Sequence, residues 1–360
     1  MRRLVQWLLS AFAIAALIAC DGEPPEPDAG PTEDAGEEDA GDASTDPPDT
    51  GSGDCEGPPG LYEDGACTVV AAGVRPYQPR FQLWADGADK ERYIALPPGE
   101  TIDTRDPDNW VFPVGTRIYK TFLQDGVRLE TRILEKDELG TGIGAWEMRV
   151  YAWNETQDGV TDVTNLDESI RQDVLGTEHD IPSGADCLRC HGGLDVVNGF
   201  SAIQLNHAGP GVTLQTLLDE GLLTEAVAPA DADVPGDATA QAALGYLHAN
   251  CGHCHRENAS DAAAMTTGLW MWVNVDDTTV EGTDAHTTAV SEVASYFHPD
   301  AICRVHPGSP DSSLTLVRMA ERGDRAQMPP LATERADDEG LAAVRAWIAT
   351  LTGDGTACEP

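Results

Sequence analysis

Basic residues are scarce in this sequence: 22 Lys and Arg side chains stand against 62 Asp and Glu side chains, a formal net charge of −40. A phosphate backbone attracts the opposite charge, so this composition excludes bulk attraction to nucleic acid. Long apolar runs are absent after residue 20, so no later segment predicts a membrane span. Nine cysteines in 360 residues are too few for a small disulfide-rich protein, and the length allows two ordinary domains with sizeable cores.

Residues 1–20 have the pattern of an export signal. Two arginines precede an apolar run over residues 4–19, which is shorter than the about 20 residues that a membrane span needs. The run ends in Leu17-Ile18-Ala19-Cys20, which resembles the cleavage box of bacterial lipoproteins. Cys20 is therefore the predicted lipidation site, and a plain signal peptide followed by a chance cysteine is the alternative.

Residues 21–54 are strongly acidic, with 13 Asp and Glu, no basic residue, and six each of Pro and Gly. Such a segment cannot bury enough apolar surface to offset the entropy of ordering, so we expect a disordered tether. Together with Cys20, it predicts a lipid-anchored protein of the bacterial cell envelope that faces the periplasm or the cell surface. The lipid anchor is the only membrane contact that we expect.

Residues 55–225 read as a β-rich domain, because β-branched and aromatic residues alternate with polar ones in several short runs. The expected strands are Phe81–Trp84, Arg92–Ala95, Arg117–Phe122, Val127–Ile133 and Trp146–Trp153. An antiparallel sandwich or barrel-like sheet would bury their apolar faces. Residues 226–236, rich in Ala, Asp and Pro, resemble an interdomain linker.

Residues 237–360 change to a helical period and predict a small all-α domain. Apolar residues share one helix face over residues 240–247, and a second apolar stripe follows the acidic turn at residues 337–339 and extends to Leu351. The expected fold is therefore a multidomain α+β protein, with an antiparallel β-rich domain followed by an all-α domain.

Two pentapeptides have the pattern C-x-x-C-H: Cys187-Leu188-Arg189-Cys190-His191 and Cys251-Gly252-His253-Cys254-His255. Two thiols at this spacing can each add to one vinyl group of a haem, and the adjacent imidazole can then bind the iron. Two such motifs in an exported chain predict two covalently bound haem c groups. The expected attachment sites and iron ligands are Cys187, Cys190, Cys251, Cys254, His191 and His255.

Three other interpretations of these motifs compete with haem attachment. A zinc site would have to pool ligands from both motifs, although 60 residues lie between Cys190 and Cys251. Structural disulfides would not explain the His that follows each cysteine pair. A thioredoxin-like site would follow a buried strand, whereas an Ala-rich helical pattern precedes Cys251.

The sixth iron ligands are less well defined by the sequence. Met328 lies in Gln327-Met328-Pro329-Pro330, 73 residues after His255, and is the predicted thioether ligand of the second haem. His and Met together favour ferrous iron and raise the reduction potential. For the first haem, His207 is the nearest downstream candidate and His179 lies upstream, and an open coordination position is the alternative.

Residues 237–351 resemble a class I cytochrome c domain, on the second C-x-x-C-H motif, the Met328 loop and a helical pattern at each end. Gly245, Tyr246 and Trp347 match positions where such domains pack their terminal helices. Four segments resemble a bacterial di-haem lipoprotein family: Leu83-Trp84-Ala85-Asp86-Gly87-Ala88, Phe112–Thr116, Leu129-Glu130-Thr131-Arg132 and Ile181-Pro182-Ser183. This resemblance implies a β-rich domain joined to a cytochrome c domain.

Four cysteines remain after Cys20 and the two motifs are set aside: Cys55, Cys67, Cys303 and Cys358. Four thiols allow three pairings, and an oxidising compartment favours disulfides over free thiols. A bond from Cys55 to Cys67 would close a short loop, and one from Cys303 to Cys358 would hold the C-terminal tail.

These observations predict an electron-transfer protein, with a di-haem redox enzyme such as a peroxidase as the alternative. A weaker third hypothesis treats the β-rich domain as a binding module.

After removal of the leader, residues 55–236 carry 13 basic against 31 acidic side chains, and residues 237–360 carry 7 against 18. We therefore expect a redox protein partner with a basic docking face, whose association slows as salt screens the attraction.

Overall fold

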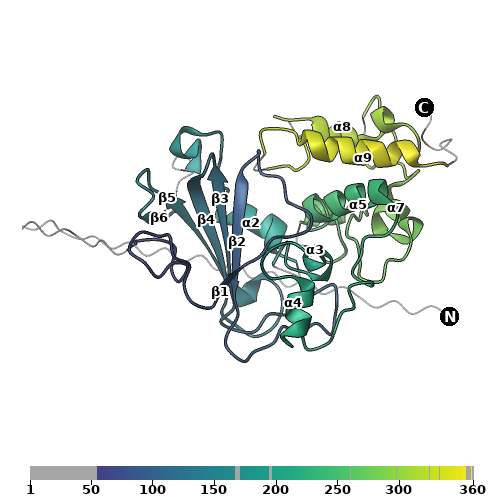
Figure 1. The fold of residues 1–360 in the computed structure, drawn as a ribbon. Helices are drawn as coiled ribbons and strands as arrows, with labels where there is room; N and C mark the ends of the chain where they lie inside the picture. The colour runs from purple at the N-terminus through teal and green to yellow at the C-terminus, as the bar shows by residue number, and fades with distance from the viewer. Residues whose placement is uncertain are drawn as a thin grey trace, which may run out of the picture. The chain divides into compact units, whose positions relative to one another are not determined.

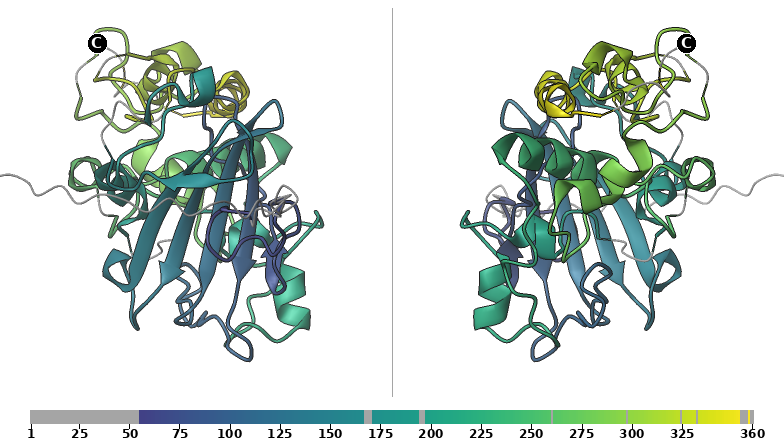
Figure 2. Two further views of the ribbon diagram at one scale, coloured as in Figure 1. Left: turned by 90° about the vertical axis from the view of Figure 1, so that its left-hand side faces the viewer. Right: turned by 90° about the vertical axis from the view of Figure 1, so that its right-hand side faces the viewer.

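Six antiparallel strands form one sheet in which each strand pairs with its neighbour in sequence (Figure 1). The computed structural model describes residues 55–166, 171–193, 197–259, 261–296, 298–323, 325–331, 333–353 and 358. The strands are β1 (Val74–Pro76), β2 (Asp89–Ala95), β3 (Arg117–Gln124), β4 (Val127–Lys136), β5 (Trp146–Trp153) and β6 (Val160–Asp162). Asp125 and Gly126 join β3 to β4 with φ angles of 51° and 80°, which suits a two-residue hairpin turn. Figure 2 shows the strands side by side.

Four of the five predicted strands are confirmed as β2, β3, β4 and β5. The prediction for Phe81–Trp84 is wrong, because this segment is irregular. Its backbone bonds to side chains instead of a neighbouring strand: the N–H of Phe81 donates to Gln204 Oε1 at 2.9 Å, and that of Trp84 donates to Asn250 Oδ1 at 2.7 Å. This segment therefore has the composition of a strand but forms part of the connection between β1 and β2.

Short helices make up the regular structure of the rest of the described chain. They are α2 (Gly184–His191), α3 (Ala202–Leu205), α4 (Leu214–Asp219), α5 (Ala238–Asn250), α6 (Ala262–Met265), α7 (Asp284–Ala289), α8 (Leu314–Ala320) and α9 (Asp338–Thr350). Single 3-10 turns are η1 (Ile143–Ala145), η2 (Val174–Gly176), η3 (Val280–Gly282) and η4 (Pro310–Ser312). No strand occurs between residues 237 and 353 among the residues described there, although isolated bridges such as Val293 with Cys303 do.

Helices α5 and α9 confirm the two predicted helices, and they pack against each other (Figures 1 and 2). Each begins at an Asp whose carboxylate accepts backbone N–H bonds, Asp237 for α5 and Asp337 for α9. Gly340 allows the close approach, since a Cβ there would lie 2.1 Å from a ring carbon of Tyr246. Trp347 of α9 is almost fully buried.

The expected sandwich or barrel is replaced by a single sheet with differently covered faces. Ile94, Ile118 and Leu134 on one face join an apolar core that includes helices α3, α4, α5 and α9. On the other face, Tyr119 and Ile133 pack with residues of the N-terminal segment around Leu61. One sheet is sufficient because helices and a loop supply the second layer on each side.

Residues 226–236 belong to this same core, although the sequence resembles a linker. Val227, Ala232 and Val234 are buried in the cluster that holds residues from both the β-rich and the helical regions. The chain divides into Met1–Gly51 and Ser52–Pro360, and every described residue lies in the second unit. An α+β fold with an antiparallel sheet is therefore shown, and its two regions share a core.

Two disulfides select one of the three pairings that the sequence allows. They join Cys55 to Cys67 and Cys303 to Cys358, each with a Cα–Cα distance of 5.2 Å. Cys303 makes backbone bridges with Val293 and Ser313, so the second disulfide attaches the C-terminal tail to a packed segment.

The predicted export signal, Cys20 and the acidic tether over residues 21–54 lie outside the described residues. Among the helices of the described part, none has both the length and the hydrophobicity to cross a bilayer.

Candidate functional site

The first cysteine motif lies on helix α2. Ser183 and Asp186 start this helix with reciprocal contacts, in which each side chain accepts the other residue's backbone N–H at 3.2 Å. Helix positions i, i+3 and i+4 share a face, so Cys187, Cys190 and His191 lie on the same side of α2. The capping box fixes where α2 begins, and the helix then places Cys187, Cys190 and His191 on one face.

The second motif forms a tight turn directly after α5. The carbonyl of Cys251 accepts from the N–H of Cys254 at 3.1 Å and from that of His255 at 2.8 Å. A Cβ at Gly252 would lie 2.6 Å from the carbonyl oxygen of His248. The turn therefore requires glycine at position 252, directly after the first cysteine of the motif.

One cavity of about 440 Å³ brings the two motifs together. Seven of the residues predicted to attach or ligate haem contribute to its lining: Cys187, Cys190, His191, Cys251, Cys254, His255 and Met328. The rest of the wall includes residues of β2, β3 and β4, of the irregular segment after Pro79, and of helices α6 and α8. The seven predicted residues span 142 positions of sequence, from 187 to 328, and thus surround a single space.

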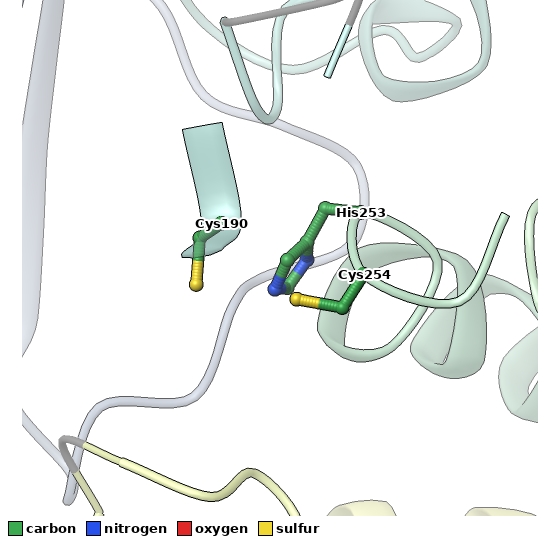
Figure 3. Close-up of side chains that lie close together, drawn as sticks. All are labelled: Cys190, His253 and Cys254. Atoms are coloured by element: carbon green, nitrogen blue, oxygen red, sulfur yellow. The ribbon is translucent and has the colours of Figure 1, made fainter. Parts of the chain in front are cut away.

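Three side chains of the two motifs, Cys190, His253 and Cys254, lie close together. One ligand atom from each of these residues lies within 4.8 Å of the others. Figure 3 shows the imidazole of His253 and the sulfur of Cys254 on the side that faces Cys190, which comes from the end of α2. Cys254 Sγ also lies 3.3 Å from the backbone oxygen of Arg189.

This contact corrects one argument made from the sequence. The 60 residues between Cys190 and Cys251 do not separate the motifs in space, so sequence distance is no reason against a shared metal site. Two thiol sulfurs and an imidazole are a donor set that suits Zn²⁺ or another soft divalent ion. A shared Cys and His site therefore competes with haem attachment on chemical grounds.

The cysteines of the cavity differ in acidity. Burial raises the pKa of Cys251 to about 12. A hydrogen bond from Cys254 lowers the pKa of Cys190, and the same contact raises the pKa of Cys254. Cys190 is therefore the sulfur of this pair that more readily becomes a thiolate, and Cys254 holds the proton.

The second motif presents an oriented, neutral imidazole. His255 Nδ1 lies 3.2 Å from the carbonyl oxygen of Leu269, so Nδ1–H donates and Nε2 carries the lone pair. Burial lowers the pKa of His255 to about 4, which keeps the ring neutral at physiological pH. A neutral imidazole with a fixed tautomer is the form that binds iron or zinc.

Met328 lines the same cavity and is held by its backbone. Its N–H donates to the carbonyl of Arg318 at 2.8 Å, and its own carbonyl accepts from Arg322 Nη1 at 3.4 Å. Two prolines follow, and both also line the cavity. Met328 therefore lines the same space as both motifs, and its role as an iron ligand stays a prediction.

His207 is the exception among the predicted ligands, because it is absent from the cavity lining. Its Nε2 lies 2.7 Å from the backbone oxygen of Gln78, and its Nδ1 accepts from the N–H of Gly209 at 2.9 Å. With both ring nitrogens engaged, no lone pair remains for a metal. His179, the upstream candidate, does line the cavity, with its Nε2 2.8 Å from Glu130 Oε1.

Charged residues of the sheet are the part of the site that sequence reasoning missed. Arg92, Lys120 and Arg132 line the cavity, and Glu130 beside them is fully buried. The alternation along β4 gives Glu130 and Arg132 the polar positions of a half-buried strand, which would face solvent. The signal that could have identified them is their concentration on three consecutive strands in a chain that is otherwise poor in basic residues.

No protein-family model, curated protein or solved structure matches this chain. The site itself therefore carries the functional argument. Its donors are thiols, imidazoles and a thioether around one cavity, which can attach and ligate a haem or hold a soft metal ion.

Proposed function

We propose that this protein is an exported di-haem c-type cytochrome that transfers electrons through covalently bound haems. The observation that carries the proposal is the shared cavity, where both C-x-x-C-H motifs and Met328 converge. Neither disulfide uses a motif cysteine, so all four thiols are free for attachment.

Each motif supplies a complete attachment unit in this proposal. Cys187 and Cys190 attach the first haem and His191 ligates it. Cys251, Cys254 and His255 serve the second in the same way, with Met328 as its sixth ligand. A haem bound there would supply the reversible change between the ferric and ferrous states, and the residues that ligate it would set its potential.

The closeness of the motifs favours electron exchange between the two groups. Cys190 and Cys254 hold sulfur atoms within 4.8 Å of each other, so both groups would be attached beside one contact. The rate of electron tunnelling falls steeply with distance, so haems that lie side by side exchange electrons fast.

The packing of helices α5 and α9 around Gly340 and Trp347 further supports a cytochrome c-like arrangement of residues 237–351.

Lipidation at Cys20 and the acidic tether complete the proposal as a cell-envelope electron carrier. The strongly acidic chain suits a redox protein partner with a basic docking face. Electrostatic steering of this kind weakens with salt, because the Debye length shortens to about 8 Å at physiological ionic strength.

A di-haem redox enzyme is the second candidate, and the bonding of His207 favours it. With His207 engaged by Gln78 and Gly209, the first haem lacks its predicted sixth ligand. His179 lines the cavity but is hydrogen-bonded to Glu130. An open iron position beside such a pair could bind peroxide, with the second haem as the electron source.

The test begins with the haem content of the chain, produced in cells that attach haem c. Covalent haem is quantified on a denaturing gel and as the pyridine haemochrome, and metals are measured by mass spectrometry. We expect two haems per chain, with one lost in Cys187→Ala/Cys190→Ala and the other lost in Cys251→Ala/Cys254→Ala. Cys303→Ala is the control cysteine variant, and we expect it to retain both.

Two other outcomes separate the competing interpretations. A chain with no covalent haem and one zinc ion, lost in Cys190→Ala, would overturn the cytochrome proposal in favour of the Cys and His site. High-spin ferric absorption that changes on addition of peroxide would select the redox enzyme over the electron carrier.

A further inference from the structure

Three cationic side chains form a row across the sheet at the cavity wall. Arg92 of β2 is the register partner of Lys120 of β3, which is in turn the register partner of Arg132 of β4. All three contribute to the cavity lining, and this set is called the cation row below. Opposed residues on neighbouring strands have Cβ atoms about 5 Å apart, so like charges there repel one another.

Glu130 neutralises one member of the cation row. Its carboxylate accepts from Arg132 Nη2 at 2.6 Å and from Arg132 Nε at 2.9 Å, a two-point contact. The same carboxylate bonds to His179 at 2.8 Å. Glu130 is therefore committed to Arg132 and His179, and Arg92 and Lys120 remain to be accounted for.

Neither Arg92 nor Lys120 forms an ion pair in the part of the chain that the structure describes, and the Glu130 charge that also acts on Lys120 is bonded to Arg132 and His179. Arg92 is 4% exposed, and its Nη1 is buried without a hydrogen-bond partner among these residues. Lys120 is half-buried, and its Nζ lies 4.9 Å from the ring centroid of Phe122, a contact that offsets only part of the cost of removing the charge from water. Burial, together with the nearby Arg92, lowers the pKa of Lys120 well below its usual value.

The other carboxylates of the cavity lining are engaged elsewhere. Asp180 accepts the N–H of Asp173 at 3.0 Å, and Asp186 takes part in the capping box of α2. Asp261 forms an ion pair with Arg189 at 3.0 Å. None of these contacts serves Arg92 or Lys120, so this part of the wall has excess positive charge in a chain with a net charge of −40.

We propose that the cation row binds one carboxylate, or a small oxyanion of similar shape, inside the cavity, with Arg92 and Lys120 as the donors. A guanidinium offers paired N–H groups to the two oxygens of such a ligand, and an ammonium adds a point charge. An anion here relieves the repulsion within the row and satisfies the buried Nη1 of Arg92.

Two sources have this chemistry, and the second does not require haem. One is a propionate side chain of a haem attached in the cavity, an assignment that rests on the proposed function. The other is a free oxyanion that enters from solvent.

The variants Arg92→Gln and Lys120→Gln remove one cation each. Arg117→Gln is the matched control, because Arg117 lies on β3 with Lys120 but at an alternate position, on the opposite face, where it pairs with Glu135. Arg92→Lys retains the charge and serves if Arg92→Gln fails to fold. Haem content is measured first for every variant, so that loss of haem is not mistaken for loss of the anion site.

Two measurements on the haem-loaded chain then distinguish the sources. One is the midpoint potential of each haem, and the other is the Soret shift during titration with formate or nitrite. If a haem propionate binds to the cation row, one haem should have a lower midpoint potential in both variants. Removing a cation weakens the electrostatic repulsion that disfavours ferric iron, so the oxidised state becomes more stable. A propionate bound in this way also predicts no saturable response to either probe.

A free oxyanion predicts a saturable Soret shift in the unmodified chain. The dissociation constant then rises about 10- to 100-fold in Arg92→Gln and Lys120→Gln, the loss expected for a charged hydrogen bond, and stays unchanged in Arg117→Gln. Unchanged potentials together with no saturable response in a fully loaded chain would overturn the proposal.

Absence of covalent haem would instead refute the proposed function alone. Formate and nitrite binding is then measured on the haem-free chain by calorimetry. Binding that is weakened in Arg92→Gln supports the cation row, and no binding in the unmodified chain refutes it.

Discussion

Glu130 is predicted to stabilise the folded chain at neutral pH through its contacts with Arg132 and His179. Its side chain is fully buried and accepts two hydrogen bonds from Arg132 and one contact from His179. Replacing Glu130 with Gln removes the anion and leaves Arg132 beside Lys120 and without its buried partner. Breaking a buried pair in this way typically costs about 3–5 kcal/mol.

The pKa of Glu130 gives a second route to the magnitude. Burial by itself would raise this pKa, but the charge and hydrogen bonds of Arg132 and His179 lower it from 4.5 to about 2. At about 1.4 kcal/mol for each pH unit, the difference corresponds to about 3 kcal/mol of folding free energy. Because the folded-state pKa is depressed, this contribution is fully present above about pH 4.5 and is lost as the pH falls towards 2.

The assay is urea unfolding of the unmodified chain and Glu130→Gln at several pH values from 7 to 3. We expect Glu130→Gln to be less stable by about 3 kcal/mol at pH 7, and this deficit to fall below half by pH 3. Glu135→Gln is the control, because Glu135 lies on the same strand and pairs with Arg117 and Arg149 at a more exposed position. We expect it to cost about 1 kcal/mol or less. A deficit for Glu130→Gln that does not change with pH would refute the reasoning.

Three further predictions concern the second motif, its thioether and the tail. Met328→Ala should remove low-spin character from one haem only and lower its potential, measured by absorption spectra and redox titration; an unchanged spectrum would exclude Met328 as a ligand. Gly252→Ala should destabilise the chain by about 1–3 kcal/mol in urea unfolding, because its Cβ would lie 2.6 Å from the oxygen of His248, and unchanged stability would contradict this. Replacing Cys303 and Cys358 together with Ser should cost about 4 kcal/mol, given the 55-residue separation, and a loss below about 1 kcal/mol would show that the tail is held by other contacts.

Local patterns predicted the regular elements well where one periodicity dominates. The apolar stripes before Cys251 and up to Leu351 became α5 and α9, each begun by an Asp cap. Alternation likewise located β3, β4 and β5. These elements depend on neighbours within a few residues, and such information is present in the sequence itself.

Other patterns were misleading because their partners are distant in sequence. Phe81–Trp84 has the composition of a strand, but its backbone bonds to Gln204 and Asn250, more than 100 positions away. Residues 226–236 look like a linker, and they become part of the core only because residues on both sides pack around Ala232 and Val234. Local composition does not report such contacts.

The sequence by itself determined which chemical groups are available: two pairs of thiols with adjacent imidazoles, a thioether followed by two prolines, and very few basic residues. Only the tertiary structure decided where these groups meet. Pairing of β2, β3 and β4 aligned Arg92, Lys120 and Arg132, and packing around one core brought Cys190 to Cys254 and excluded His207 from the cavity. The physical reason is that spacing governs neighbours within a helix or turn, whereas contacts between segments depend on burial and pairing across the whole chain.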